Sequence, residues 1–134
     1  MIVAYCTYCS KDKVATAHPL SAIERYQSQR IRYVYDLAQK DHRDFFILSG
    51  EFGLLTADQM IPYYDHLLLP SEVQDMRKQV EQQLTEQKIE SIKFFTASIE
   101  DQATVLPYNQ VIEQACANLH LGFSKITLEN PYLD

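Results

Sequence analysis

The sequence predicts an α/β fold: a single three-layer α/β/α domain, residues 1–134, around a mainly parallel sheet of about four strands. Short apolar runs rich in β-forming residues recur along the chain. Segments with apolar residues at helical spacing separate these runs. Strands joined through helices of this length form crossover units, which give a parallel sheet covered on both faces.

The first strand is expected at residues 2–6, a short apolar run typical of a strand buried on both faces. A helix should begin at Ser21, because Glu24 three residues later completes a capping box. Its inward positions follow at helical spacing, so one helix, straight or bent, is expected to continue to about Lys40. The predicted inward stripe is Ile23, Tyr26, Arg30, Tyr33 or Val34, and Leu37.

Residues 45–48 form the second predicted strand, which Ser49 and Gly50 end sharply. Residues 55–70 lack a clear period and contain two prolines, so an ordered surface loop with room for one helical turn is expected there. Ser71 should cap the next helix. The apolar stripe of that helix is Val73, Met76, Val80 and Leu84.

The third strand is predicted at residues 92–96. Pro107 at the first helical position should open the last helix, and Gly122 should end it. A fourth strand is expected at residues 125–128. No repeat, low-complexity tract or linker interrupts this order.

The composition favours an acidic globular protein, with 46% hydrophobic residues and a formal net charge of −6. An acidic chain is poorly suited to duplex nucleic acid, because such binding needs several Lys and Arg contacts to phosphates. The first quarter of the chain nevertheless contains several cationic residues. They suit a small anionic ligand, and binding of single-stranded nucleic acid is an alternative. They are Lys11, Lys13, Arg25, Arg30 and Arg32.

The chain starts without a basic leader and has no apolar run near the ~20 residues of a membrane helix. We therefore expect a cytoplasmic protein with reduced thiols and no membrane contact. Cys6 and Cys9 spell a C-x-x-C pair, which redox and zinc sites also use. Because Cys6 lies in the predicted strand and no second close pair follows, we expect it in the core, with no metal and no cofactor.

The loop after the first strand is the first candidate site segment. It places a thiol, a hydroxyl and two ammonium groups within five residues: Cys9, Ser10, Lys11, Asp12 and Lys13. Such a loop can hold an anion through its backbone N–H groups, the hydroxyl and the lysines. The alternative is an ordinary solvated loop with surface lysines.

The turn after the second strand is the other candidate, because two of the three glycines in the chain are Gly50 and Gly53. Glycine allows close backbone approach to a ligand, and Ser49 and Glu51 add a hydroxyl and a carboxylate. A tight turn with glycine chosen for sterics alone is the competing interpretation. Ligands of open parallel sheets bind outside the carboxyl ends of the strands, so the two segments should share one rim.

Downstream, Tyr63 and Tyr64 can stack on a base or a sugar, and His66 can move a proton near neutral pH. The alternative is a loop held in place by buried tyrosines. If the protein is an enzyme, Glu51 and His66 are the candidates for proton transfer.

Three stretches together resemble the YaaA-like superfamily of bacterial and phage proteins, many of them domains of unknown function. They are residues 2–13 with Cys-Ser-x-x-Lys, residues 19–28, and residues 47–63 with Leu-Ser-Gly-x-x-Gly-Leu before Ile-Pro-Tyr. The resemblance implies an α/β core and a link to peroxide stress and DNA binding. It also implies a polar pocket lined by Ser10, Lys13, Ser49, Gly50 and Tyr63.

This chain departs from YaaA proteins in being shorter and acidic, and in lacking a Gly-rich insertion similar to a helix-hairpin-helix motif. Its Cys-Ser-x-x-Lys loop is also similar to one in archaeosine synthases, where the lysine serves as amine donor or nucleophile. Lys13 would be the counterpart, so this resemblance adds Lys13 to the catalytic candidates Glu51 and His66.

The leading hypothesis is a pocket for a small anionic, nucleotide- or nucleoside-like ligand, with room for chemistry at the base or its N-glycosidic bond. Lys11 and Lys13 would hold the anionic group, Cys9, Ser10, Ser49, Gly50 and Gly53 would shape the site, and Tyr63 or Tyr64 would stack. One alternative is a non-catalytic stress-response or defence module that binds nucleic acid or a protein partner. Another is an interaction domain that forms an oligomer through its Tyr-rich loop.

Overall fold

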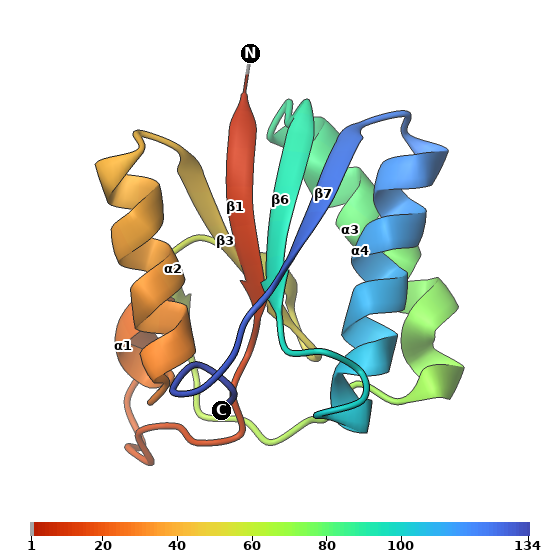
Figure 1. The fold of residues 1–134 in the computed structure, drawn as a ribbon. Coiled ribbons are helices and arrows are strands. Elements are labelled where there is room, and N and C mark those ends of the chain that lie inside the picture. The colour runs from red at the N-terminus through yellow and green to blue at the C-terminus, as the bar shows by residue number, and fades with distance from the viewer. Residues whose placement is uncertain (1) are drawn as a thin grey trace.

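The structure, a computed structural model, describes residues 2–134 (Figure 1). Its strands are β1 (Val3–Tyr8), β2 (Leu20–Ser21), β3 (Asp44–Ser49), β4 (Gly53–Leu55), β5 (Met60–Ile61), β6 (Ser91–Thr96) and β7 (Gly122–Thr127). Its helices are α1 (Ala22–Arg25), α2 (Gln29–Lys40), α3 (Val73–Glu86) and α4 (Leu106–Asn118), with 3₁₀ turns η1 (Pro70–Glu72) and η2 (Ala103–Val105).

The main sheet has the strand order β4-β3-β1-β6-β7, and only its edge strand β4 runs antiparallel. Helix α2 lies on one side of this sheet, and α3 and α4 lie on the other (Figure 1). An α/β fold with a mainly parallel sheet is therefore confirmed. The sheet has five strands instead of about four, because the three-residue β4 is too short to show a periodic pattern.

The single helix predicted from Ser21 to about Lys40 is wrong, because the chain breaks it into α1 and α2. Tyr26 has an extended backbone and forms an isolated bridge with Lys13. Ser28 then caps α2, its hydroxyl accepting a hydrogen bond from the Ile31 amide at 3.0 Å. The backbone pairing of Tyr26 with the loop after β1 thus interrupts the helix, although the apolar spacing continues through this segment.

The stretch from residue 55 to 70 contributes one strand, β5, to a second, two-stranded sheet that the sequence did not indicate. β5 pairs antiparallel with β2, and Leu20 lies opposite Ile61. Residues 56–69 form no helical turn; the 3₁₀ turn η1 begins only at Pro70, so Ser71 lies within η1 and does not cap α3, which Glu72 precedes. The predicted stripe of α3 is confirmed as buried.

The end of α4 also differs from the expectation. The helix ends at Asn118, and His120 adopts a left-handed backbone with φ of 56°. Gly122 therefore begins β7 and does not end the helix, so the predicted role of Gly122 is wrong.

The outer edge of β4 is closed by a side chain from α3. The Gln83 side-chain oxygen accepts from the Leu54 amide at 2.8 Å, and its nitrogen donates to the Leu54 carbonyl at 3.2 Å. Gln83 thus makes the hydrogen bonds that a neighbouring strand would make. Across residues 2–134, no helix has the length and apolar character needed to span a bilayer.

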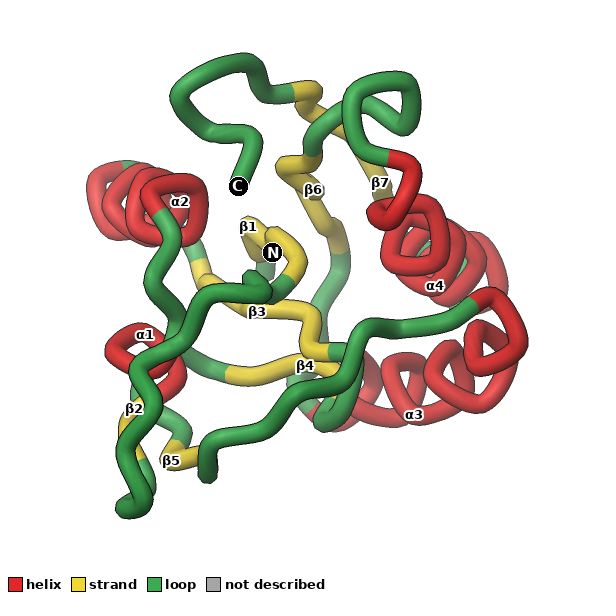
Figure 2. The backbone as a smooth tube through the Cα atoms, turned by 90° about the horizontal axis from the view of Figure 1, so that it is seen from below, coloured by secondary structure: helices red, strands yellow, loops and turns green. Residues whose placement is uncertain are grey.

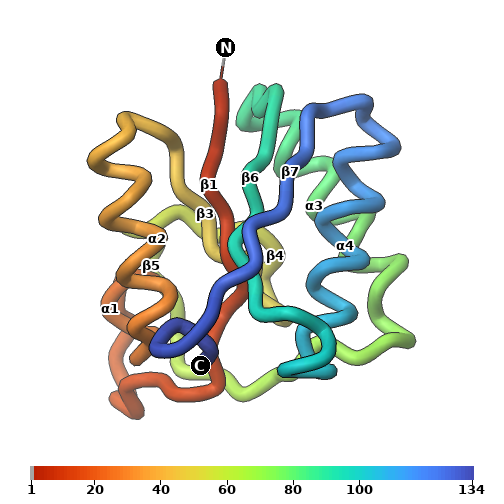
Figure 3. The backbone as a smooth tube through the Cα atoms, viewed as in Figure 1, coloured from red at the N-terminus to blue at the C-terminus, as the bar shows by residue number. Residues whose placement is uncertain are grey.

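The strand order also fixes where a ligand site is expected. The chain leaves β1 to form β3 on one side of it, then crosses to form β6 on the other. In open α/β sheets, such a switch point leaves a crevice outside the carboxyl ends of the two strands. Figure 2 views the molecule from this end, and Figure 3 shows that the last residues of the chain return to it.

Candidate functional site

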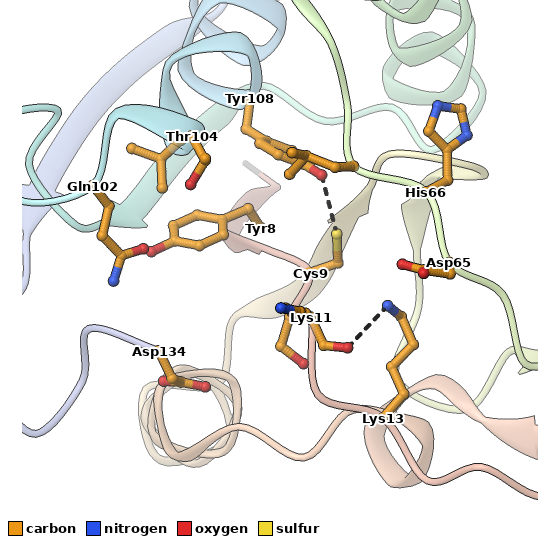
Figure 4. A pocket seen from close by; sticks show the side chains of 13 residues that line it. Tyr8, Cys9, Lys11, Lys13, Asp65, His66, Gln102, Thr104, Tyr108 and Asp134 are labelled. Carbon is orange, nitrogen blue, oxygen red and sulfur yellow. Dashed lines mark hydrogen bonds between the residues drawn. The ribbon is translucent and has the colours of Figure 1, made fainter.

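A cavity of about 370 Å³ lies at this switch point (Figure 4). Four segments line it: the end of β1 with its loop, the segment between β5 and α3, the start of α4 with the turn before it, and the last residue described. The lining residues are Tyr8, Cys9, Ser10, Lys11, Lys13, Asp65, His66, Leu67, Gln102, Thr104, Val105, Tyr108 and Asp134.

Two tyrosine rings and a thiol form the inner part of the cavity. The rings of Tyr8 and Tyr108 pack with centroids 5.9 Å apart. The Cys9 thiol donates to the Tyr108 hydroxyl at 3.5 Å, and the Leu68 amide donates to the same oxygen at 3.1 Å. Burial raises the pKa of both tyrosines, so their hydroxyls stay protonated at neutral pH.

Two ammonium groups belong to the loop after β1. Lys13 donates to the Lys11 carbonyl at 3.4 Å, and its Nζ lies 4.6 Å from the centroid of the Tyr64 ring. Ser10 donates to the Asp12 carbonyl at 2.7 Å, which fixes the loop from within. Lys11 is exposed and makes no side-chain hydrogen bond or ion pair with the described residues, so its ammonium is available to a ligand.

Polar side chains stand at two separate places around the cavity. In Figure 4, Lys13 and Asp65 lie on one side, while Gln102 and Thr104 lie on the opposite side, beyond the Tyr8 ring. The site therefore offers the ammonium groups and Asp65 at one end, and the neutral groups of Gln102 and Thr104 with the Asp134 carboxylate below them at the other.

Arg30 supports the cavity from behind and was missed as a site residue. Its side chain is fully buried, and its guanidinium carbon lies 3.6 Å from the centroid of the Tyr8 ring. It donates to the Thr7 hydroxyl and the Tyr8 carbonyl at 2.6 Å each, and to the Cys9 carbonyl at 3.2 Å. Burial lowers the pKa of Arg30, yet an arginine so well provided with acceptors stays charged. The sequence signal for this role is the place of Arg30 on the predicted inward stripe.

Arg25 is also fully buried, so fewer cations of the first quarter reach the surface than the sequence suggested. It donates to the Val14 carbonyl at 2.6 Å and to the His18 carbonyl at 2.7 Å. These bonds hold the long loop before β2. The cations of this region that remain exposed or half-exposed are Lys11, Lys13 and Arg32.

The turn after β3 lies beside the cavity and does not line it. The Ser49 hydroxyl is fully buried and accepts from the amides of Glu51 and Phe52 at 3.0 Å each. It also bonds the Tyr64 hydroxyl at 2.9 Å, which in turn bonds the Tyr26 hydroxyl. Ser49 thus organises the turn and ties it to two buried phenols.

The two glycines of this turn have steric roles in the structure. A Cβ on Gly50 would lie 2.7 Å from the His66 carbonyl oxygen and 3.0 Å from the Tyr108 hydroxyl. Gly53 has a positive φ of 72° at the start of β4. Gly50 therefore lets the wall of the cavity pack against β3, and Gly53 makes the reversal into β4.

His66 is held between two carboxylates. Its Nδ1 lies 2.5 Å from a Glu51 oxygen, and its Nε2 lies 2.8 Å from a Glu72 oxygen. These hydrogen bonds, to Glu72 first and then to Glu51, raise the pKa of His66 from its ordinary 6.5. The hydrogen bond from His66 lowers the pKa of Glu72. Figure 4 shows the ring turned away from the two lysines, so neither ring nitrogen is free to serve a ligand there.

The structure thus brings together five of the residues that the sequence proposed. Those at the cavity are Cys9, Ser10, Lys11, Lys13 and His66. The remaining proposed residues do not line it; they are Ser49, Gly50, Glu51, Gly53, Tyr63 and Tyr64. Tyr63 is half exposed, whereas Tyr64 packs on Phe52 and Tyr26.

Two parts of the lining were not predicted from the sequence: Asp65 beside Lys13, and the wall formed by Tyr8, Gln102, Thr104 and Tyr108. One signal could have pointed to part of it. The loop after the third predicted strand leaves the same rim of a parallel sheet, so residues near 102 belong to the same search region.

Comparison with known proteins identifies one family model that matches the chain. Residues 5–122 match the profile of a family of unknown function, DUF6884. No curated protein and no solved structure matches the chain. The matched stretch runs from within β1 to the first residue of β7 and so includes most of the cavity lining. The chain belongs to the DUF6884 family.

Proposed function

We propose that this protein binds a small anionic ligand of the nucleotide or nucleoside type in the cavity at the switch point. One observation carries the proposal: a single cavity joins the ammonium groups of Lys11 and Lys13 to the rings of Tyr8 and Tyr108. Lysines suit an anionic group, and aromatic faces or edges suit a base or sugar.

The size and position of the cavity support this proposal. A volume of about 370 Å³ falls within the usual range of small-molecule pockets. Its place outside the carboxyl ends of β1 and β6 is the common ligand position in open α/β sheets. Arg30 stiffens the exit of β1, so the loop that carries both lysines is held before the ligand arrives.

The proposal concerns binding, and any reaction would use the groups that face the ligand. Cys9 is the thiol of the cavity, and Asp65 and Asp134 are its aspartates. His66 is a weaker candidate for proton transfer than the sequence suggested, because both of its nitrogens are already bonded to carboxylates. Chemistry at a base or its N-glycosidic bond would therefore depend on Cys9 or on one of these two aspartates.

The test is a thermal-shift screen of nucleosides, nucleotides, deazaguanines and phosphosugars, followed by calorimetric titration of any compound that stabilises the protein. Lys13→Ala should remove the shift. Lys40→Ala is the matched control, because Lys40 is exposed in the last turn of α2, outside the cavity lining. Equal binding by Lys13→Ala and the parent protein would refute the assignment of the site.

A further inference from the structure

The cavity contains polar side chains that the protein itself leaves unused. Asp65, Gln102 and Thr104 line it, and their side chains form no hydrogen bond or ion pair with any residue in 2–134. Lys11 shares this condition. Groups of this kind are available to a ligand, so their charges and positions limit what the ligand can be.

The positive charge of the cavity is small and comes from Lys11 and Lys13. Arg30 adjoins the site, but its guanidinium already donates to the Thr7 hydroxyl, to the Tyr8 and Cys9 carbonyls, and through Nε to the main-chain oxygen of Asp134. Two ammonium groups balance one phosphate monoester, which carries a charge of about −1.5 to −2 at neutral pH. A longer polyphosphate would exceed this positive charge.

Negative charge stands beside these lysines. Asp65 lies on the same side of the cavity as Lys13 in Figure 4, whereas Asp134 lies on the other side, below Gln102. A second or third phosphate, or the next nucleotide of a strand, would add negative charge beside Asp65 in a protein of net charge −6. Like charges repel, and the repulsion grows where water is partly excluded.

The opposite end of the cavity, where Gln102 and Thr104 lie and Asp134 excludes a second anion, suits a neutral group with both donors and acceptors. Gln102 offers an amide oxygen and an NH₂ group, and Thr104 offers a hydroxyl. A glutamine amide can pair with a base edge through two hydrogen bonds. In Figure 4 the Tyr8 ring lies between this end and the lysines, where a sugar would sit.

We infer that the ligand is a free nucleoside monophosphate, with its phosphate at Lys11 and Lys13 and its base edge at Gln102 and Thr104. This inference rests on the proposed function and narrows it to one phosphate group. Asp65 then acts as a specificity residue that disfavours diphosphates, triphosphates and polynucleotides.

The experiment is calorimetric titration of the full chain with adenosine, guanosine, cytidine and uridine, and with their mono-, di- and triphosphates. At least one monophosphate should bind about ten- to a hundredfold more tightly than its nucleoside, which is the usual effect of a charge-assisted hydrogen bond. Lys11→Ala and Lys13→Ala should each reduce that difference. Asp65→Asn should raise the affinity for the matching diphosphate relative to the monophosphate. Asp44→Asn is the control, because Asp44 is an exposed carboxylate at the start of β3, outside the cavity lining. It should change neither the affinity difference between monophosphate and nucleoside nor that between diphosphate and monophosphate.

The outcomes separate the inference from the proposed function. Tightest binding of a triphosphate, or equal binding of nucleoside and monophosphate, would overturn the inference while leaving a nucleotide or nucleoside site intact. If Asp65→Asn leaves the ratio of diphosphate affinity to monophosphate affinity unchanged, Asp65 does not have the specificity role assigned to it. Absence of binding by every compound in the series would overturn both.

Discussion

The guanidinium of Arg30 stacks on the ring of Tyr8 at 3.6 Å and donates hydrogen bonds to the carbonyls of Tyr8 and Cys9. One buried cation thus fixes both the aromatic wall of the cavity and the start of the lysine-bearing loop. The relationship gives the helix α2 a direct part in the site, although Arg30 does not line the cavity itself.

Arg30→Met should lower the free energy of unfolding by about 3 kcal/mol or more, because it leaves several buried acceptors without donors. Urea unfolding followed by circular dichroism measures this loss. Arg32→Met is the control, since Arg32 is exposed two residues further along α2 and should change stability by less than about 0.5 kcal/mol. Similar losses in the two variants would contradict the role assigned to Arg30.

The contacts of His66 with Glu51 and Glu72 should make stability depend on pH. The raised pKa of His66 means that its contribution is complete below pH 6.5 and is lost as the pH rises through the raised value. The lowered pKa of Glu72 means that its contribution is present above pH 4.5 and is lost as the pH falls. The combined effect is therefore greatest between these two pH values.

Urea midpoints of the parent protein and of Glu72→Gln at pH 5.5, 7.5 and 9 test this expectation. The variant should lose most stability at pH 5.5, and the difference should shrink as His66 deprotonates. Glu86→Gln, an exposed carboxylate at the other end of α3 with no ion pair among residues 2–134, should show no such trend. A difference that is constant with pH would count against the His66 contacts as its source.

Gly50→Ala should destabilise the protein and disturb the cavity wall. The new methyl group would press against the His66 carbonyl and the Tyr108 hydroxyl, and overpacking of this kind costs about 1–3 kcal/mol. Thermal unfolding measures the loss. Gly122→Ala is the milder comparison, because the nearest atom there is the side-chain hydroxyl of Ser91, which can rotate away. A Gly50→Ala protein as stable as the parent would show that the wall can shift freely.

Cys9 should be the first of the three thiols to react with iodoacetamide. It lines the cavity, whereas Cys6 and Cys116 are fully buried and burial raises the pKa of both thiols. Peptide mass spectrometry after timed alkylation of the native protein gives the order of reaction. A bound ligand should slow the labelling of Cys9, and Cys9→Ser should leave the native protein nearly unlabelled. Faster reaction at Cys116 would argue against access through the cavity.

The sequence identified much of the fold because strand and helix periods are local properties. The buried run before Tyr8, the stripe of α3 and the loop from Cys9 to Lys13 could all be recognised from neighbouring residues. Patterns among neighbouring residues did not predict elements that depend on partners distant in the sequence or that are only a few residues long. The break between α1 and α2 depends on the bridge from Tyr26 to Lys13, and β4 depends on β3 and Gln83 for its hydrogen bonds.

By itself, the sequence determined the alternation of strands and helices and one half of the cavity, the loop after β1, because both follow from residues close together in the chain. The tertiary structure decided the other half. The crossing of the chain from β3 to β6 brings Gln102, Thr104 and Tyr108 to the far side of Cys9. The same packing buries Arg25 and Arg30, and it makes the turn with Gly50 and Gly53 a structural support of the cavity wall and not part of its lining. Burial and distant contacts of this kind are set only when the strands take their order in the sheet.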